Sequence, residues 1–374
     1  MRFGTMVWRL LVAWPLAFAA APATATAASE WPEWNGFAQR FVQADGRVID
    51  LTFDRKSTSE GQSYGLFFAL VADQRTQFDT LLKWTSDNLA SGQLGDKLPA
   101  WLWGQRENGS WGVKDANSAS DADLWLAYTL LEAARLWNAP RYAEIGRKLL
   151  AQVHRQEVVE AGTAGPLLLP GAIGFVLDKR GWRMNPSYLP GFMFRYLAGA
   201  DPQGPWQALW DRYLRLAPVI FAAGVAPDNI VVDPSGRPLP DTEQPPSGSY
   251  DAIRVYLWAG LSAPSDQGLV RMLAPYAALT RKLGTPPEKV DPATGTPTKL
   301  DYSPIGFSGA LLPLLSALPD AATLEKQRER LRAAAKAGGT THYYDQVLIL
   351  FGQGWLDGRY RFDAQGRLQP AWSR

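Results

Sequence analysis

The sequence predicts an all-α fold in which paired helices close into a toroid, on the basis of three observations. Beyond residue 30, apolar residues recur with helical spacing in segments of helix length. Loops rich in Gly and Pro separate these segments, and no low-complexity linker divides them. An even number of paired helices in one domain favours a ring of helical hairpins, with a cleft at one end lined by helix N-termini.

The helical pattern divides into twelve segments, and two other stretches are typical of strands. The predicted helices cover residues 32–43, 60–74, 76–90, 120–137, 141–155, 188–199, 204–223, 250–262, 265–283, 304–317, 321–338 and 341–353. Residues 158–185 and 229–241 have short apolar runs punctuated by Gly or Pro, which indicates strands or hairpins. The Pro-rich stretch 240–251 is the best candidate for a domain boundary. We interpret it as an active-site loop, because the helix after it continues the earlier pattern.

The first 28 residues have the features of a secretory signal peptide. Arg2 and Arg9 precede an apolar run from Leu10 to Ala21, and residues 25–27 fit an A-x-A cleavage site. The run is too short for a comfortable membrane span. We therefore expect residues 29–374 to form one domain without a membrane span, located in the periplasm or secreted.

The amino-acid composition limits the classes of ligand that the protein is expected to bind. The chain is 46% hydrophobic and 20% charged, with 16 Trp, 13 Tyr and 15 Phe, and flat aromatic surfaces of this kind often stack sugars or bases. The formal charge is only +2, and no long Lys/Arg block is present, which argues against nucleic acid. The chain has no Cys, which excludes thiol catalysis and Cys-based metal sites. We expect no cofactor and no metal.

The stretch STSEGQSYG places one carboxylate just before a long apolar run. Glu60 could simply be a first-turn acid at a helix start. Gly61 and Gly65 are poor residues for a first helical turn unless something approaches the backbone closely. Gln62 and Tyr64 add polar and aromatic groups beside the carboxylate, as a sugar site requires. Both readings remain open from this stretch alone.

Two more helix starts carry acids. In NSASDADLWLAYTLLEAARLW, Asp121 and Asp123 follow Ser120, which could be an N-cap, but the same acids could hold sugar hydroxyls. In SGSYDAIRVYLW, Asp251 lies three residues before Arg254. That pair is either a local ion pair or a carboxylate that Arg254 keeps ionised to activate water.

Aromatic residues in the loops could be sugar platforms. Trp101, Trp103 and Trp111 fall in a stretch expected to be a loop between helices, and Tyr188 and Tyr250 stand at the first positions of predicted helices. Each ring taken singly is more often packing than platform. The three acidic helix starts could nevertheless converge on one cleft, and glycosidic hydrolysis needs one protonated carboxyl and one carboxylate. The two His residues have no zinc or serine-nucleophile motif beside them, and phosphate-loop motifs are absent.

Taken together, TSEGQSYG, NSASDADLWLAYTLLEAARLW, NPSYLP, SYDAIRVYLW and FGQGW resemble glycoside hydrolase family 8. The likeness runs in order from about Trp31 to the C-terminus and includes connecting pieces such as LPAWLWG and PPEKVD. The likeness is greatest to the branch of the family whose members are encoded together with bacterial cellulose synthase. The resemblance implies an (α/α)6 barrel with short β-hairpin insertions. It also implies endo-1,4-β-glucanase activity on cellulose or soluble glucan, with inversion, and association with a cellulose synthase complex.

The resemblance also implies roles for individual residues. Glu60 would be the general acid and Asp251 the base that activates water. Asp121 would bind and distort the central sugar, while Tyr188 and Arg254 would hold the water and the base. The full expected site is catalytic Glu60, Asp121 and Asp251 and substrate-binding Gln62, Tyr64, Trp101, Trp103, Asp123, Tyr188, Tyr250 and Arg254. Inversion predicts a separation of roughly 6.5–9.5 Å between the acid and base carboxyls.

Three alternatives remain open from the sequence. The same machinery could act on xylan or chitosan, and chitosan would favour extra acids along the cleft. A non-catalytic cellulose-binding component would have aromatic platforms without a catalytic carboxyl pair. A polysaccharide lyase would need Tyr and His at the scissile sugar.

Overall fold

The computed structural model describes Met1, Gly4 and residues 30–162, 165–243, 246–262 and 265–374. The helices in these residues are α1 Pro32–Phe41, α2 Ser59–Val71, α3 Arg75–Leu89, α4 Ser120–Leu136, α5 Pro140–Glu157, α6 Gly191–Ala200, α7 Trp206–Ile220, α8 Ala252–Ser262, α9 Gln267–Leu283, α10 Ile305–Ala317, α11 Ala321–Lys336 and α12 Tyr343–Leu356. Each predicted helix corresponds to one of these, with ends shifted by a few residues. The all-α prediction is confirmed.

The helices of the described residues form five hairpins of consecutive helices and a sixth pair, in which α12 packs against α1 from the other end of the chain. The inner members α2, α4, α6, α8, α10 and α12 pack against α3, α5, α7, α9, α11 and α1 in turn. Aromatic contacts join inner neighbours: Phe68 of α2 lies 4.7 Å from Phe351 of α12, and Trp125 of α4 lies 5.9 Å from Phe192 of α6, between ring centroids. The fold is therefore an (α/α)6 barrel, as the family resemblance implied.

The burial of side chains separates inner from outer helices. Every residue of α2 except Glu60 is buried, because its neighbours surround it on all sides. On the outer helix α5, the buried positions Tyr142, Gly146, Leu149 and Val153 recur every three or four residues, which places one apolar face against the ring.

Aromatic rings fill the centre of the barrel. The ring of Trp125 lies 5.7 Å from Tyr64, 5.5 Å from Trp258 and 5.3 Å from Phe351, between centroids. These residues come from α4, α2, α8 and α12, so one indole contacts helices from across the barrel. Much of the aromatic content is therefore core.

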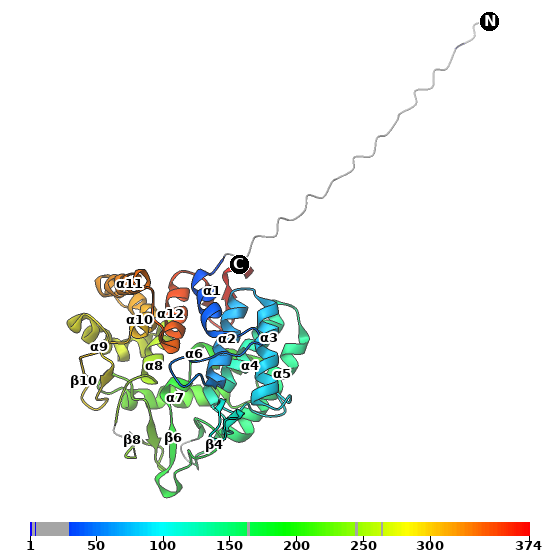
Figure 1. Cartoon of the computed structure of the whole chain (residues 1–374). Helices are drawn as coiled ribbons and strands as arrows, with labels where there is room; N and C mark the ends of the chain where they lie inside the picture. Colours follow the sequence, from blue (N-terminus) through cyan, green and yellow to red (C-terminus); the bar gives the residue numbers. More distant parts are fainter. Residues whose placement is uncertain (2–3, 5–29, 163–164, 244–245, 263–264) are drawn as a thin grey trace.

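Short strands lie in the loops between helices and after α12, and in the described residues they form five small sheets. They are β1 Ser57–Thr58, β2 Leu102–Gln105, β3 Trp111–Asp115, β4 Val158–Glu160, β5 Pro166–Leu168, β6 Trp182–Met184, β7 Ile230–Val232, β8 Pro238–Pro240, β9 Lys289–Val290, β10 Pro297–Lys299, β11 Tyr360–Phe362 and β12 Leu368–Pro370. Strands β4, β6 and β8 gather on the lower side of Figure 1. The two predicted strand regions contain β4 to β6 and β7 to β8.

One expectation about the loops was wrong. The stretch that carries Trp101, Trp103 and Trp111 was expected to be a loop, but much of it forms the hairpin β2–β3, with Trp103 paired to Val113. Strand β1 joins this hairpin through the pairing of Ser57 with Trp103. The sheet therefore leads directly into the start of α2.

The predicted signal peptide, residues 1–28, lies outside the described residues except for Met1 and Gly4. In the described ranges, no helix combines the length and apolar character needed to cross a membrane.

Candidate active site

Glu60 lies in the first turn of α2, and its side chain is 23% exposed. The Thr58 hydroxyl caps this helix by accepting a hydrogen bond of 3.0 Å from the Gly61 N–H. The Ser59 N–H donates to the Trp101 carbonyl at 3.0 Å, so the strand region anchors the helix start. A Cβ on Gly61 would lie 2.8 Å from the Tyr343 hydroxyl. The close approach expected at this glycine is present, and it comes from another part of the protein.

Asp121 lies at the start of α4. The Ser120 hydroxyl donates to the Leu169 carbonyl at 2.6 Å and the Ser120 N–H to the Pro170 carbonyl at 3.0 Å. Ser120 is therefore not an N-cap; it fixes the helix start to the chain after β5. The Ala122 N–H donates to Asp121 Oδ1 at 2.8 Å. These bonds hold Asp121 in one orientation.

Asp251 stands in the turn before α8, and Asp228 shapes that turn. Asp228 Oδ1 accepts from the N–H groups of Ser249, at 2.7 Å, and Ala252, at 2.9 Å. Asp228 Oδ2 accepts from the Ser249 hydroxyl at 2.6 Å. Because three donors converge on it, Asp228 is a structural carboxylate that fixes the turn carrying Asp251.

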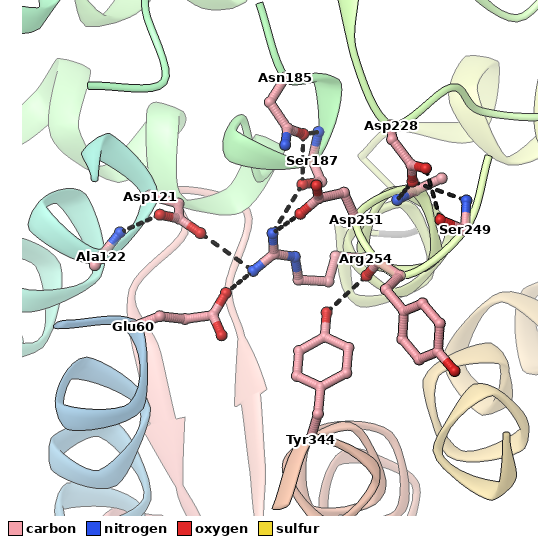
Figure 2. Close-up of polar contacts among 12 residues, drawn as sticks. Glu60, Asp121, Ala122, Asn185, Ser187, Asp228, Ser249, Asp251, Arg254 and Tyr344 are labelled. Carbon is pink, nitrogen blue, oxygen red and sulfur yellow. Dashed lines mark hydrogen bonds and ion pairs between the residues drawn. The ribbon is translucent and has the colours of Figure 1, made fainter. Parts of the chain in front are cut away.

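The Arg254 guanidinium joins the three acidic helix starts (Figure 2). Its Nη1 contacts Glu60 and lies 3.1 Å from Asp121 Oδ2. Its Nη2 lies 2.6 Å from Asp251 Oδ1. The Arg254 side chain is only 3% exposed, whereas Glu60 is 23%, Asp251 40% and Asp121 6% exposed. Glu60 and Asp251 are the two more exposed carboxylates, and different nitrogens of one buried guanidinium thus hold them.

Three further side chains surround the Arg254 guanidinium. The Tyr64 hydroxyl lies 3.2 Å from Nη1 and the Ser187 hydroxyl 3.3 Å from Nη2. The guanidinium carbon also lies 5.5 Å from the ring centre of Tyr188. Asn185 orients Ser187 by accepting from both its N–H and its hydroxyl, at 2.9 and 2.7 Å.

The crowding of acids changes their proton affinity. Burial raises the pKa of Asp121 to about 7; the charge of Glu60 adds to this, and Arg254 opposes it. Burial likewise raises the pKa of Asp251, with Arg254 opposing and Asp228 adding to the shift. A site that holds carboxyls with raised pKa values beside one cation is suited to proton transfer.

Aromatic side chains lie on the chain segments next to Glu60 and Asp251. The rings of Trp103 and Trp111 are stacked, with centroids 5.4 Å apart, and the Arg47 guanidinium lies over both. Trp111 is 45% exposed. On the Asp251 side, exposed Tyr250 packs against Phe307 with ring centroids 5.3 Å apart. Trp101, half-buried, precedes β2.

Two predicted substrate-binding residues do not reach the cleft. Gln62 is fully buried; its Oε1 accepts from the Val48 N–H at 2.6 Å and its Nε2 donates to Thr85 Oγ1 at 2.9 Å. Asp123 is also fully buried. Both side chains point into the protein, so the structure does not support substrate contact by either.

Sequence reasoning missed four residues that build the site: Asn185, Ser187, Asp228 and Tyr344. The hydroxyl of Tyr344 donates to the Tyr250 carbonyl at 2.8 Å (Figure 2). Of the four, Asn185 had a local signal, since Asn followed by Pro and Ser is typical of the start of a short helical turn.

Comparison with known proteins identifies the family. The family described as "Glycosyl hydrolases family 8" matches residues 6–358. The chain is 48% identical to an endoglucanase of Xanthomonas axonopodis pv. citri over 97% of each chain, and 45% identical to an endoglucanase of Escherichia coli K12 over 93% of each. The crystal structure of an endo-1,4-D-glucanase from Vibrio fischeri superposes with a TM-score of 0.87 at 38% identity, covering 92% of this chain and all of the other. This chain therefore belongs to glycoside hydrolase family 8 and is a glycoside hydrolase.

Proposed function

We propose that the protein is an endo-1,4-β-D-glucanase that cleaves internal bonds of cellulose or soluble glucan with inversion. Relatives of 39–48% identity that cover more than nine-tenths of the chain are endoglucanases. The single observation that supports the mechanism is the placement of Glu60 and Asp251, both accessible, on separate nitrogens of Arg254.

In this mechanism Glu60 protonates the leaving oxygen while Asp251 removes a proton from the attacking water. The water attacks the anomeric carbon on the face opposite the departing oxygen, so the configuration inverts in one displacement. Asp121, deeper in the site, holds a hydroxyl of the central sugar. Arg254 keeps the acid and the base apart and fixes both orientations. Trp101, Trp103, Tyr188 and Tyr250 complete the proposed sugar contacts, whereas Tyr64 is 1% exposed and supports Arg254 from behind.

The charge beside the Trp103–Trp111 stack favours a glucan over chitosan at that position. The Arg47 guanidinium lies 4.3 Å from the ring centre of Trp103 and 4.8 Å from that of Trp111. The ammonium groups of chitosan would meet this positive charge at the stacked rings, whereas glucose hydroxyls would not. We further propose a role beside cellulose synthesis in the periplasm or outside the cell, after removal of residues 1–28.

The roles of the two carboxyls are separable with two substrates. Glu60→Gln should lose about 10²–10⁴-fold in kcat/KM on soluble β-1,4-glucan, because the leaving sugar needs a proton. The same variant should lose far less on 2,4-dinitrophenyl β-cellobioside, whose leaving group departs unprotonated. Asp251→Asn is the matched control and should lose activity on both. An equal loss of kcat/KM by Glu60→Gln on both substrates would show that Glu60 is not the general acid.

Proton NMR of fresh products tests the stereochemistry. Inversion predicts that wild-type enzyme releases the α-anomer first from soluble glucan. Initial release of the β-anomer would leave the substrate assignment intact but would exclude the single-displacement mechanism. If wild-type enzyme cleaves xylan or chitosan but not glucan, the substrate assignment is wrong. If it binds glucan and cleaves none of these, the binding-component alternative is correct.

A further inference from the structure

A second pair of carboxyls lies behind the active site, between α4 and α5. Asp123, in the first turn of α4, and Glu157, the last residue of α5, are both fully buried. The Ser118 hydroxyl donates to Glu157 Oε1 at 2.6 Å. Within the described residues, both oxygens of Asp123 and Oε2 of Glu157 lack a hydrogen-bond donor.

Unpaired carboxylate oxygens at this depth would be strongly unfavourable. The side chains of Asp123 and Glu157 are within hydrogen-bonding reach of each other. Two carboxylates cannot bond to each other, but one carboxylic acid can donate to one carboxylate. A shared proton therefore supplies the missing donor.

We infer that Asp123 and Glu157 share a proton and that this pair positions Asp121 for sugar binding. Asp121 lies two residues before Asp123 on the same helical turn. The Leu169 N–H donates to the Glu157 carbonyl at 2.8 Å, and the Ser120 hydroxyl donates to the Leu169 carbonyl. The end of α5, the chain after β5 and the start of α4 are thus fastened together around the pair. Asp123 is a positioning residue and not a substrate ligand.

The proton affinities agree with this geometry. Burial raises the pKa of Glu157 to about 8, and the charge of Asp121 adds to the shift. Burial and the charge of Glu157 raise the pKa of Asp123 well above its usual range. The groups that face the pair are Asp121 and the Ser118 hydroxyl. Loss of the shared proton would leave like charges in contact, beside a third at Asp121, and would loosen the start of α4.

The sign of the pH effect follows from the raised pKa values. The folded protein binds the proton more tightly than the unfolded chain, so stability falls as pH rises from about 4.5, the ordinary value of Glu, to about 8. Glu157→Gln replaces the shared proton with an amide N–H that can donate to Asp123 at every pH. Its melting temperature relative to wild type should therefore rise with pH across this range.

The inference rests on the proposed function for its activity readout, so the experiment has two arms. The first measures melting temperatures of full-length wild type, Glu157→Gln and Glu157→Ala from pH 5 to pH 9, without substrate. The second measures kcat/KM on soluble β-1,4-glucan over the same range. The ratio of Glu157→Gln to wild type should stay near one at pH 5 and rise severalfold at pH 9. Titrations common to both enzymes cancel in this ratio.

Glu157→Ala provides the control for packing alone, and should be less stable at every pH. A melting-temperature difference between Glu157→Gln and wild type that is constant with pH would overturn the shared proton. A pH-dependent difference with a flat kcat/KM ratio would overturn the positioning of Asp121. If Glu157→Gln does not fold, Asp123→Asn restores the same donor from the other side and is judged by the same outcomes. Failure of wild type to cleave glucan would refute the proposed function and leave the first arm intact.

Discussion

Arg254 is the residue on which the geometry of the site depends. It carries one positive charge among Glu60, Asp121 and Asp251, and its side chain is 3% exposed. Buried ion pairs contribute little net stability, because the desolvation cost offsets the attraction. The arrangement is better understood as positioning: one planar group sets the orientation of the acid and the base together.

Asp228 tunes the proposed base without touching substrate. Its negative charge contributes to the raised pKa of Asp251. In Asp228→Asn the amide oxygen can still accept from the N–H groups of Ser249 and Ala252, so the turn should persist. Asp251 should then have a lower pKa and remain ionised in more acidic solution. The acid limb of kcat/KM on soluble glucan should therefore move to lower pH.

Arg254→Met is the control of opposite sign for this prediction. Arg254 lowers the pKa of Asp251, so its removal should move the acid limb to higher pH, in addition to reducing activity. If the acid limb of the kcat/KM profile moves in neither variant, then another group, such as Asp121, controls that limb. Asp251 would then lose its assignment as the base.

At this scale the sequence predicted the acids better than their neighbours. One residue turns an α-helix by about 100°, so side chains two positions apart point to nearly opposite sides. Gln62 after Glu60 and Asp123 after Asp121 therefore turn into the protein. Tyr64, four residues after Glu60, returns to the face of the site and contacts Arg254. The angular position of each residue on its helix would therefore have distinguished Gln62 and Asp123 from Tyr64.

The remaining site residues lacked such a signal. Asp228 and Tyr344 act on residues that are tens of positions away in the chain. Only the folded barrel brings these segments together. Single-sequence periodicity reports which residues share a helix face, but not which distant loop meets that face.

Among the elements, the helices were predictable and the sheet that leads into the site was not. Helices of 10 to 18 residues carry several repeats of the apolar pattern. Strand β1 has only two residues, and its partner β2 begins at Leu102. A pairing so short and so distant leaves almost no periodic signal. The Trp-rich stretch 101–111 was consequently interpreted as a loop.

The contact between α10 and α12 depends on two glycines. A Cβ on Gly352 would lie 1.8 Å from the Gly309 carbonyl oxygen, a distance that requires the backbones to separate. Gly352→Ala should therefore reduce the free energy of unfolding by about 1–3 kcal/mol, as overpacking does in well-packed cores. Urea unfolding monitored by Trp fluorescence would measure the change.

Gly36→Ala in α1 is the matched control, because a Cβ there meets no atom within 4 Å. This change should stabilise the protein by about 0.5–1 kcal/mol through the helix propensity of Ala. If both substitutions stabilise the protein, the close approach of α10 and α12 is incorrect.

For the whole molecule, the C-terminal hairpin β11–β12 joins helices that are distant in the chain. The Leu368 N–H donates to Glu132 of α4 at 2.6 Å, and the Tyr360 hydroxyl donates to the Phe351 carbonyl of α12 at 2.8 Å. The ring of Phe362 stacks on Phe192 of α6 with centroids 3.8 Å apart. The last strands are therefore part of the single core, and we expect the barrel to unfold as one cooperative unit.

Neighbouring residues of β12 test this expectation. Leu368 is 1% exposed in the core, whereas Gln369, the next residue, is exposed. Leu368→Ala should lower the free energy of unfolding by about 2–5 kcal/mol, and Gln369→Ala should change it by less than about 0.5 kcal/mol.

Because the hairpin belongs to the common core, Leu368→Ala should move the whole thermal transition to lower temperature as one step. Calorimetry would detect it, and a separate early transition in Leu368→Ala would mean that the hairpin unfolds independently of the barrel. The kcat of Leu368→Ala on soluble glucan, measured well below its transition, should equal that of wild type, because Leu368 contacts none of the carboxylates around Arg254.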